Sequence, residues 1–299
     1  MAFVHPGDGA LDYYPCRYGM SKLLFRGPQR AVSGGYCVAL GGTETYGKFV
    51  PVPYPALLEQ RLGVPVINLG CVNAGPDVYL NDSAVLDVAA GAQVAMVQVV
   101  GAQNLTNRYY AVHPRRNDRF LSASPLLRQM FREVDFTEFH FTRHMLQSLQ
   151  AVGPDRFEIL AEELRAAWVQ RMKALLMRLP RARVLVWLGD HPPLRAGQSP
   201  DLHRDPILVD AEMIAALMPY VSAYAEHVGG AVQSTAGMVF APMEEPAAGP
   251  ARTCGASGAG HYAGPGVAAV PVTKKGAHKA RPSPPPQQVT AWKPVPAKR

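Results

Sequence analysis

The stretch Tyr-Cys-Val-Ala-Leu-Gly-Gly-Thr-Glu-Thr-Tyr-Gly at residues 36–47 decides the fold of this 299-residue chain. It begins with an apolar run, Cys37–Leu40, of the kind that a buried strand shows. Two glycines end the run, and three polar residues follow, Thr43, Glu44 and Thr45. Because open α/β sheets bind their ligands at the carboxyl ends of strands, the stretch predicts that these side chains lie at a ligand site on that edge.

Apolar runs that end at glycine or proline recur along the chain and alternate with helical patterns. Further strands are predicted at Val64–Leu69, Val94–Val100, Val184–Leu188 and, shorter, Gly237–Ala241. Helices are predicted at Tyr54–Leu62, Ser83–Ala90, Pro125–Glu133, Phe139–Ala151, Pro154–Leu179 and Asp210–His227. The polar, basic segment Asn104–Asp118 is predicted to be a long loop. This alternation predicts a three-layer α/β/α fold with a mostly parallel five-stranded sheet, as in flavodoxin-like proteins.

The distribution of charge divides the chain into segments. The net charge is +7, but residues 247–299 contain no Asp or Glu and eight Lys or Arg, so residues 1–246 are close to neutral. We expect an N-terminal strap at 1–29, one α/β domain at 30–246 and a disordered basic tail at 247–299. The composition changes abruptly after Pro246, which is also what an altered reading frame would produce. A native tail of this kind would attract anionic membranes or nucleic acid only non-specifically.

Several classes of protein are not indicated by the sequence. No run reaches the roughly 18–20 apolar residues of a membrane helix, and the first residues lack the pattern of a signal peptide, so a cytoplasmic protein is expected. The four cysteines form no Cys-x-x-Cys pair, and the glycines at 41, 42 and 47 lack the spacing of a dinucleotide loop. We therefore expect neither a metal nor a cofactor, and no specific binding of nucleic acid.

The order of the strand ends resembles that of the SGNH, or GDSL-like, hydrolases. The turn Gly41–Gly47 is similar to their Gly-Asp-Ser-x-Thr block, and it is followed by a Tyr-Pro helix start at Tyr54 and an Asn-Leu-Gly strand end at Asn68–Gly70. The third block of those hydrolases, Gly-x-Asn-Asp, corresponds to Gly101–Asn104. More closely, Ala2–Pro246 resembles an uncharacterised bacterial family known only as a domain of unknown function.

The hydrolase resemblance implies roles for particular residues. Thr43 stands at the position of the nucleophilic serine, and the oxyanion donors correspond to Gly70 or Gly75 and to Gln103 or Asn104. The chain departs from the pattern in three places, because Gly42 replaces the usual Asp, Thr replaces Ser, and Gln103 stands where Asn is expected. A hydroxyl nucleophile still needs a base and donors aimed at the developing oxyanion.

The base is not supplied at its usual place. The hydrolases carry Asp-x-x-His after the last strand, whereas the first histidine after Pro246 in this chain is His261. The alternative is the pair Asp190 and His191, which follows the fourth predicted strand and so belongs to the same sheet edge. Neighbouring side chains of an extended backbone diverge, so each of the two would contact Thr43 or Glu44 rather than the other.

The candidate residues at this sheet edge are compatible with two functions. The first is an esterase or acyltransferase that acts on a small-molecule or glycan ester through Thr43, with Glu44 and Thr45 among the substrate-binding residues. The second is a catalytically degenerate protein that binds an anionic ligand or glycan at the same edge. Arginine forks suit carboxylate, phosphate and sulfate groups, and the candidates for such a clamp are Arg108, Arg115 and Arg116. A histidine within hydrogen-bond reach of Thr43 would favour the enzyme.

Overall fold

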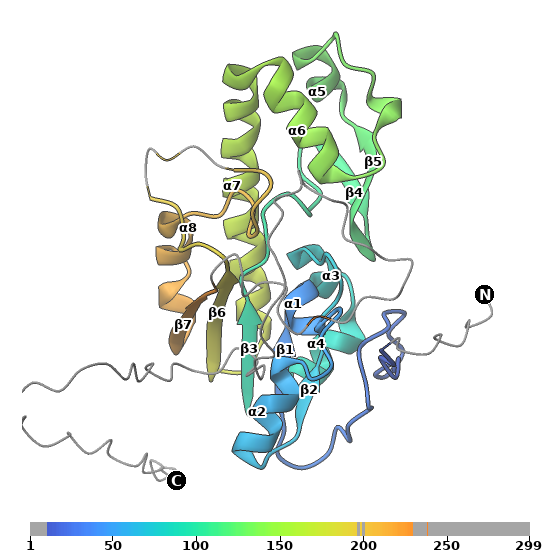
Figure 1. Ribbon diagram of the computed structural model, residues 1–299, viewed down its shortest axis with the longest axis vertical. Helices are drawn as coiled ribbons and strands as arrows, with labels where there is room; N and C mark the ends of the chain where they lie inside the picture. The colour runs from blue at the N-terminus through green and yellow to red at the C-terminus, as the bar shows by residue number, and fades with distance from the viewer. Residues whose placement is uncertain (1–10, 196–197, 199–200, 230–237, 239–299) are drawn as a thin grey trace, which may run out of the picture. The chain divides into compact units, whose positions relative to one another are not determined.

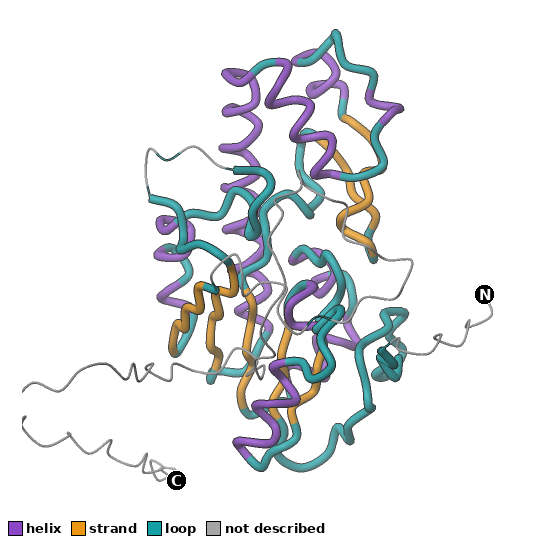
Figure 2. Tube along the Cα trace, viewed as in Figure 1, coloured by secondary structure: helices purple, strands orange, loops and turns teal. Residues whose placement is uncertain are grey.

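The computed structural model describes residues 11–195, 198, 201–229 and 238 (Figures 1 and 2). The chain divides into two compact units, Met1–Gly266 and Val267–Arg299, and every described residue belongs to the first. The predicted tail at 247–299, and His261 with it, lies outside the described residues. In the part of the chain that the structure describes, no helix is long and apolar enough to cross a membrane.

A five-stranded sheet forms the centre of the described unit. Its strands are β1 (Cys37–Leu40), β2 (Val66–Asn68), β3 (Val94–Gln98), β6 (Arg183–Gly189) and β7 (Ala223–Val228). They are arranged in the order β2-β1-β3-β6-β7, and each neighbouring pair is parallel. Four of these strands overlap the predicted apolar runs, which confirms the predicted mostly parallel sheet.

Helices cover both faces of this sheet. Successive residues of a strand point to opposite faces, so neighbouring residues of one strand pack against different helices. On β1, Val38 and Leu40 belong to the large core to which α3 (Pro76–Leu80), α4 (Ser83–Ala90) and α7 (Pro154–Arg178) contribute buried residues. The intervening Cys37 and Ala39 belong to a smaller core, against which Tyr54 and Leu58 of α2 (Tyr54–Leu62) pack. The three-layer α/β/α arrangement is therefore confirmed.

Capping and helix-stop residues in the sequence predicted the ends of α2 and α4 correctly. Pro55 occupies the first turn of α2, where the missing amide hydrogen is not needed, and Gly63 ends the helix with a left-handed φ of 65°. The Asp82 side chain accepts a hydrogen bond from the amide of Val85 at 3.1 Å and thereby caps α4. The pattern gave no sign of α3, or of the four-residue helix α1 (Thr43–Tyr46) that follows β1.

The prediction of a long loop at Asn104–Asp118 is wrong. This segment contains β4 (Tyr110–His113) and enters β5 (Arg116–Ala123), and the two strands pair as an antiparallel hairpin. Only Tyr110 and Val112 of β4 and Phe120 and Ala123 of β5 are buried apolar residues, and most of the others are polar or exposed, so the overall composition looks loop-like. The hairpin packs with α5 (Pro125–Met130) and α6 (Thr142–Val152) beyond the end toward which β3 points (Figure 1).

The predicted helix at Asp210–His227 is also wrong beyond its first turns. The segment forms α8 (Ala211–Ala215), a 3₁₀ turn η2 (Met218–Tyr220) and then β7. Pro219 cannot donate an i→i−4 hydrogen bond, and β7 pairs with β6 along its whole length. The fifth strand of the sheet is therefore β7, whereas the segment predicted for it, Gly237–Ala241, lies outside the described residues apart from Met238.

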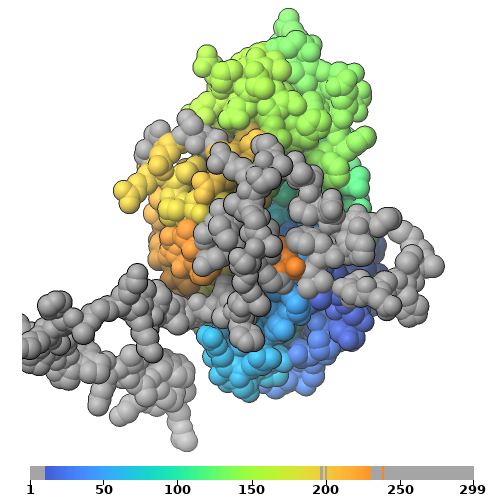
Figure 3. All heavy atoms as spheres, in the orientation of Figure 1, coloured from blue at the N-terminus to red at the C-terminus, as the bar shows by residue number. Residues whose placement is uncertain are grey.

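The N-terminal strap packs on the domain from residue 11 onward. Tyr18, Leu23 and Phe25 are buried in the large core, and the backbones of Cys16 and Phe25 exchange two hydrogen bonds of 3.0 and 2.9 Å, as in a short hairpin. The boundary between strap and domain at residue 30 stays a prediction. Figure 3 shows one face of the molecule as spheres, with the region of the hairpin, α5 and α6 in green.

Candidate functional site

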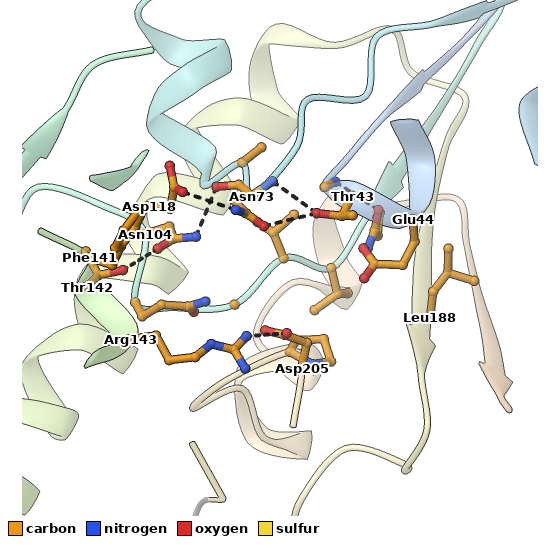
Figure 4. Close-up of a pocket in the computed structure, with 18 residues that line it drawn as sticks. Thr43, Glu44, Asn73, Asn104, Asp118, Phe141, Thr142, Arg143, Leu188 and Asp205 are labelled. Atoms are coloured by element: carbon orange, nitrogen blue, oxygen red, sulfur yellow. Dashed lines mark hydrogen bonds and ion pairs between the residues drawn. The ribbon is translucent and has the colours of Figure 1, made fainter. Parts of the chain in front are cut away.

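A pocket of about 360 Å³ opens at the carboxyl ends of β1, β3 and β6, at the edge that the sequence predicted. The segments that line it include Gly42–Glu44, Gln103–Asn104 and the first residues of α6, Thr142 and Arg143 (Figure 4). Its polar lining consists of Thr43, Glu44, Asn73, Gln98, Gln103, Asn104, Asp118, Thr142, Arg143 and Asp205.

Thr43 is the first residue of α1 and lines the pocket, where its hydroxyl is held by Asn73. Thr43 Oγ1 donates to Asn73 Oδ1 at 3.1 Å and accepts from the Asn73 amide at 3.1 Å. Asn73, whose φ is 54°, donates in turn from Nδ2 to Asp118 Oδ2 at 3.1 Å (Figure 4). The hydroxyl proton therefore points at an amide oxygen, which is not a base.

Gln98 at the end of β3 fixes the turn that carries Thr43. Its Oε1 accepts from the Gly42 amide at 2.9 Å, from the Thr45 amide at 3.2 Å and from Thr45 Oγ1 at 2.6 Å. Thr45, predicted to bind substrate, is fully buried and does not line the pocket. Gly41 is required here because a Cβ at this position would lie 2.2 Å from Thr45 Oγ1.

Glu44 presents a carboxyl group to the pocket. The residue as a whole is exposed at the mouth, but Gln98 Nε2 donates to its Oε2 at 2.6 Å. Desolvation by the surrounding protein raises the pKa of this carboxyl, and the hydrogen bond from Gln98 opposes that shift. Gln98 is the one polar residue in the predicted strand Val94–Val100, and this signal could have identified it.

Most of the predicted oxyanion donors are already used within the protein. The Gly70 amide donates to Asn68 Oδ1 at 2.9 Å, and the Gly75 amide donates to Asn117 Oδ1 at 3.2 Å. Neither glycine lines the pocket. Asn104 lines it, but its Nδ2 donates to the backbone oxygen of Asn73 at 3.0 Å. These three groups are not aimed at a bound acyl oxygen in this conformation.

Gln103 differs from the other predicted donors. Its side chain lines the pocket and the residue is 5% exposed. Its Oε1 is buried and has no hydrogen-bond partner among the described residues. Buried polar atoms are almost always paired, so this carboxamide is available for an interaction with a ligand or a water molecule.

Asp190 and His191, the predicted alternative base, are not among the residues that line the pocket. The His191 ring is buried edge-on against Trp187, with centroids 5.7 Å apart. Its Nδ1 lies 2.7 Å from the backbone oxygen of Pro192, which can only accept, so Nδ1 carries the proton. Asp190 pairs with Arg204 at 3.2 Å. Of the histidines in the described ranges, none lines the pocket or bonds to Thr43.

The three arginines predicted to clamp an anion do not line the pocket either. Arg108 pairs with Glu163 at 3.0 Å and lies over the Tyr109 ring. Arg115 and Arg116 are exposed around the turn of the β4–β5 hairpin. The sequence gave no reason to place Asn73, Asp118, Thr142, Arg143 or Asp205 at the site, because each belongs to a connection or an element terminus without a motif of its own.

The pocket is acidic overall. Among the described residues that line it, Glu44, Asp118 and Asp205 face one cation, Arg143, which forms an ion pair with Asp205, so this part of the lining carries a net formal charge of −2 (Figure 4). An aromatic side chain also borders it: Phe141 is 44% exposed, and the guanidinium of Arg119 lies 4.9 Å from its ring centroid.

The fold and this pocket define an α/β protein with a polar site at the carboxyl edge of its sheet. The chain belongs to a family described as a domain of unknown function, DUF6473, whose model matches residues 1–259. No curated protein shows a significant match.

Two solved structures from Streptomyces show a weak similarity to part of this chain. The extracellular lipase of Streptomyces rimosus is 14% identical, with a TM-score of 0.36 over 64% of this chain and 80% of that one. The phospholipase A1 of Streptomyces albidoflavus is 12% identical, with a TM-score of 0.35 over 64% and 79%. Likenesses this weak carry no argument about activity.

Proposed function

We propose that this protein binds a small, hydroxyl-rich molecule such as a sugar in the pocket at the carboxyl edge of its sheet. The observation that carries the proposal is the unpaired carboxamide of Gln103 beside three carboxylates, of which Asp118 and Asp205 each keep one oxygen without a partner among the described residues. Carboxamides both donate and accept hydrogen bonds, as sugar hydroxyls do. The pocket volume falls within the range of about 300–1,000 Å³ that is usual for small-molecule sites.

Phe141 supports the same ligand class. Phe141 borders the pocket and is exposed, and the guanidinium of Arg119 lies over its ring. An exposed aromatic side chain gives a rigid apolar surface at little entropic cost, and the C–H face of a sugar ring is the complement of such a surface.

Binding is favoured over catalysis because the catalytic groups are engaged elsewhere. The Thr43 proton is donated to an amide oxygen at 3.1 Å, and the Gly70, Gly75 and Asn104 donors are bonded within the protein. A hydroxyl becomes a useful nucleophile only when a base accepts its proton. Stabilising the oxyanion requires donors that are free to meet it.

A second function, ester hydrolysis or acyl transfer, is supported by the position of Thr43 alone. Its hydroxyl lines the pocket directly after β1. In that reaction Thr43 Oγ1 would attack the acyl carbon, a base would take the hydroxyl proton and return it to the leaving alcohol, and water would then release the acid. The base would come from outside the described residues, where His261 is the candidate.

Isothermal titration of the full chain with mono- and disaccharides, both neutral sugars and amino sugars, tests the binding function. We expect at least one sugar to bind with a dissociation constant in the millimolar range or below, and Phe141→Ala to weaken that binding. Leu121→Ala is the matched control, because Leu121 is exposed on β5 but does not line the pocket. Failure of every sugar, amino sugars included, to bind at 10 mM (roughly −3 kcal/mol or weaker) would overturn the proposal.

Hydrolysis of short-chain p-nitrophenyl esters separates the two functions. The wild type is compared with Thr43→Val, which removes the hydroxyl and keeps the branched shape, and with His261→Ala. Activity that both variants abolish would establish the hydrolase. Equal rates in all three proteins and in buffer are the result expected of a binding protein.

A further inference from the structure

We propose that the ligand of this pocket carries a positively charged amine, as an amino sugar does. This inference rests on the proposed function and deepens it, because it assigns the charge of the hydroxyl-rich molecule. Two independent observations lead to it: the net charge of the lining and the unpaired carboxamide of Gln103.

The carboxylates of the pocket retain free acceptor capacity. Asp118 Oδ2 accepts a hydrogen bond from the side-chain Nδ2 of Asn73 at 3.1 Å. Asp205 Oδ2 forms the ion pair with the guanidinium of Arg143. The second oxygen of each carboxylate has no hydrogen-bond partner among the described residues. Both residues line the pocket and are partly exposed, so a ligand can reach them.

Gln103 adds an acceptor that the protein leaves unused. The residue is 95% buried (5% exposed), it lines the pocket, and its Oε1 has no partner in the described chain. An unpaired buried acceptor destabilises a protein unless something bonds to it. The oxygen itself is buried, so a ligand that donates a hydrogen bond would satisfy it after the carboxamide turns about its terminal bond.

An ammonium group fits this wall better than a neutral or an anionic one. It offers three donors and no acceptor, and the wall offers carboxylate and carboxamide oxygens. Charges attract more strongly in a partly enclosed site than in bulk water, and the described residues of the lining have a net formal charge of −2 that Arg143 does not balance. An anionic sugar would meet repulsion from Glu44 and Asp118.

The experiment compares three sugars by isothermal titration at pH 7 and low salt. Glucosamine and glucose differ only by an amine in place of a hydroxyl, and glucuronate carries a negative charge. We expect glucosamine to bind about tenfold more tightly than glucose, a difference of roughly 1.4 kcal/mol, and glucuronate to bind more weakly than both. Added salt should lower the affinity for glucosamine and leave that for glucose unchanged.

Variants test whether the pocket produces this preference. Asp118→Asn keeps an acceptor for Asn73 and removes one charge, so it should reduce the ratio of the two affinities several-fold. Glu162→Gln removes a charge from the exposed face of α7, outside the pocket, and should leave the ratio unchanged. Unfolding followed by circular dichroism confirms that both variants are folded.

The outcomes separate the two proposals. Equal affinity for glucose and glucosamine, or a preference unchanged by Asp118→Asn, would overturn the amine assignment while sugar binding stands. Tighter binding of glucuronate would overturn it as well. Absence of binding by every sugar would overturn the proposed function and this inference together.

Discussion

Replacing Gln98 by leucine should strongly destabilise the protein, because one side chain serves three donors at the end of β3. Gln98 is 3% exposed, and its Oε1 accepts from the amides of Gly42 and Thr45 and from the Thr45 hydroxyl. Leucine has a similar size but cannot accept. The Thr45 hydroxyl keeps a second partner in Tyr54 Oη at 3.2 Å. The two backbone amides lose the acceptor that Gln98 gives them.

The magnitude follows from these two groups. Each buried donor left without an acceptor costs about 1–3 kcal/mol, so the range is about 2–6 kcal/mol. Gly42 lines the pocket, so water can replace the acceptor that its amide loses. The expected loss in the free energy of unfolding is therefore in the lower half of this range, about 3 kcal/mol. This is a large share of the roughly 5–15 kcal/mol that stabilises a typical domain.

Urea unfolding monitored by circular dichroism measures the loss directly. Gln93→Leu is the matched control, since Gln93 is an exposed glutamine just before the same strand and should change stability by less than about 0.5 kcal/mol. A loss below about 1 kcal/mol for Gln98→Leu would refute the reasoning, because it would mean that the turn does not depend on this acceptor.

Three further predictions concern the same edge of the sheet. Tyr79→Phe should lower the free energy of unfolding, measured in urea, by about 1–3 kcal/mol. The buried hydroxyl that it removes bonds to the backbone of Gly41 and to the backbone oxygen of Leu69, and an unchanged free energy would contradict this. Gly75→Ala should lower the melting temperature by several degrees or prevent folding, since a Cβ would lie 1.6 Å from the backbone oxygen of Asn104; an unchanged melting curve would exclude that contact. The raised pKa of Glu44 means that the folded state holds this proton more tightly than the unfolded state does, so its contribution to stability decreases as the pH rises above about 4.5. Glu44→Gln should therefore gain stability relative to the wild type between pH 4 and pH 8, and a constant or falling difference in urea unfolding would contradict the assigned shift.

The sheet could be predicted from the sequence because its inner strands are buried on both faces. Such strands are continuous apolar runs, as β1 and β3 are, and apolar runs also mark the edge strand β2 and the half-buried β6. The hairpin strands and β7 are apolar on one face or exposed, so their composition did not distinguish them from a loop and a helix. Their conformation is decided by the partners they pair with, which periodicity does not report.

The site was predictable only where it follows a strand end. Thr43 and Glu44 line the pocket as expected, because they come directly after β1. Asn73 and Asp205 reach the pocket from connections and Asp118 from β5, all distant from Thr43 in the sequence, and no local pattern marks them. The family resemblance assigned the oxyanion role to the amides of Gly70 or Gly75. It did not show that these amides already donate to the side chains of Asn68 and Asn117.

The contacts of the strap limit how the chain can be shortened for expression or crystallisation. Arg26 donates to the backbone oxygens of Val50 and Pro51 at 2.7 Å, and Tyr13 Oη accepts from the amide of Phe49 at 3.0 Å. These bonds hold the connection that leads from α1 to α2. A version of the protein that starts after Tyr13 would lose support for the helix that carries Thr43, so useful truncations at this end should keep residue 11 onward.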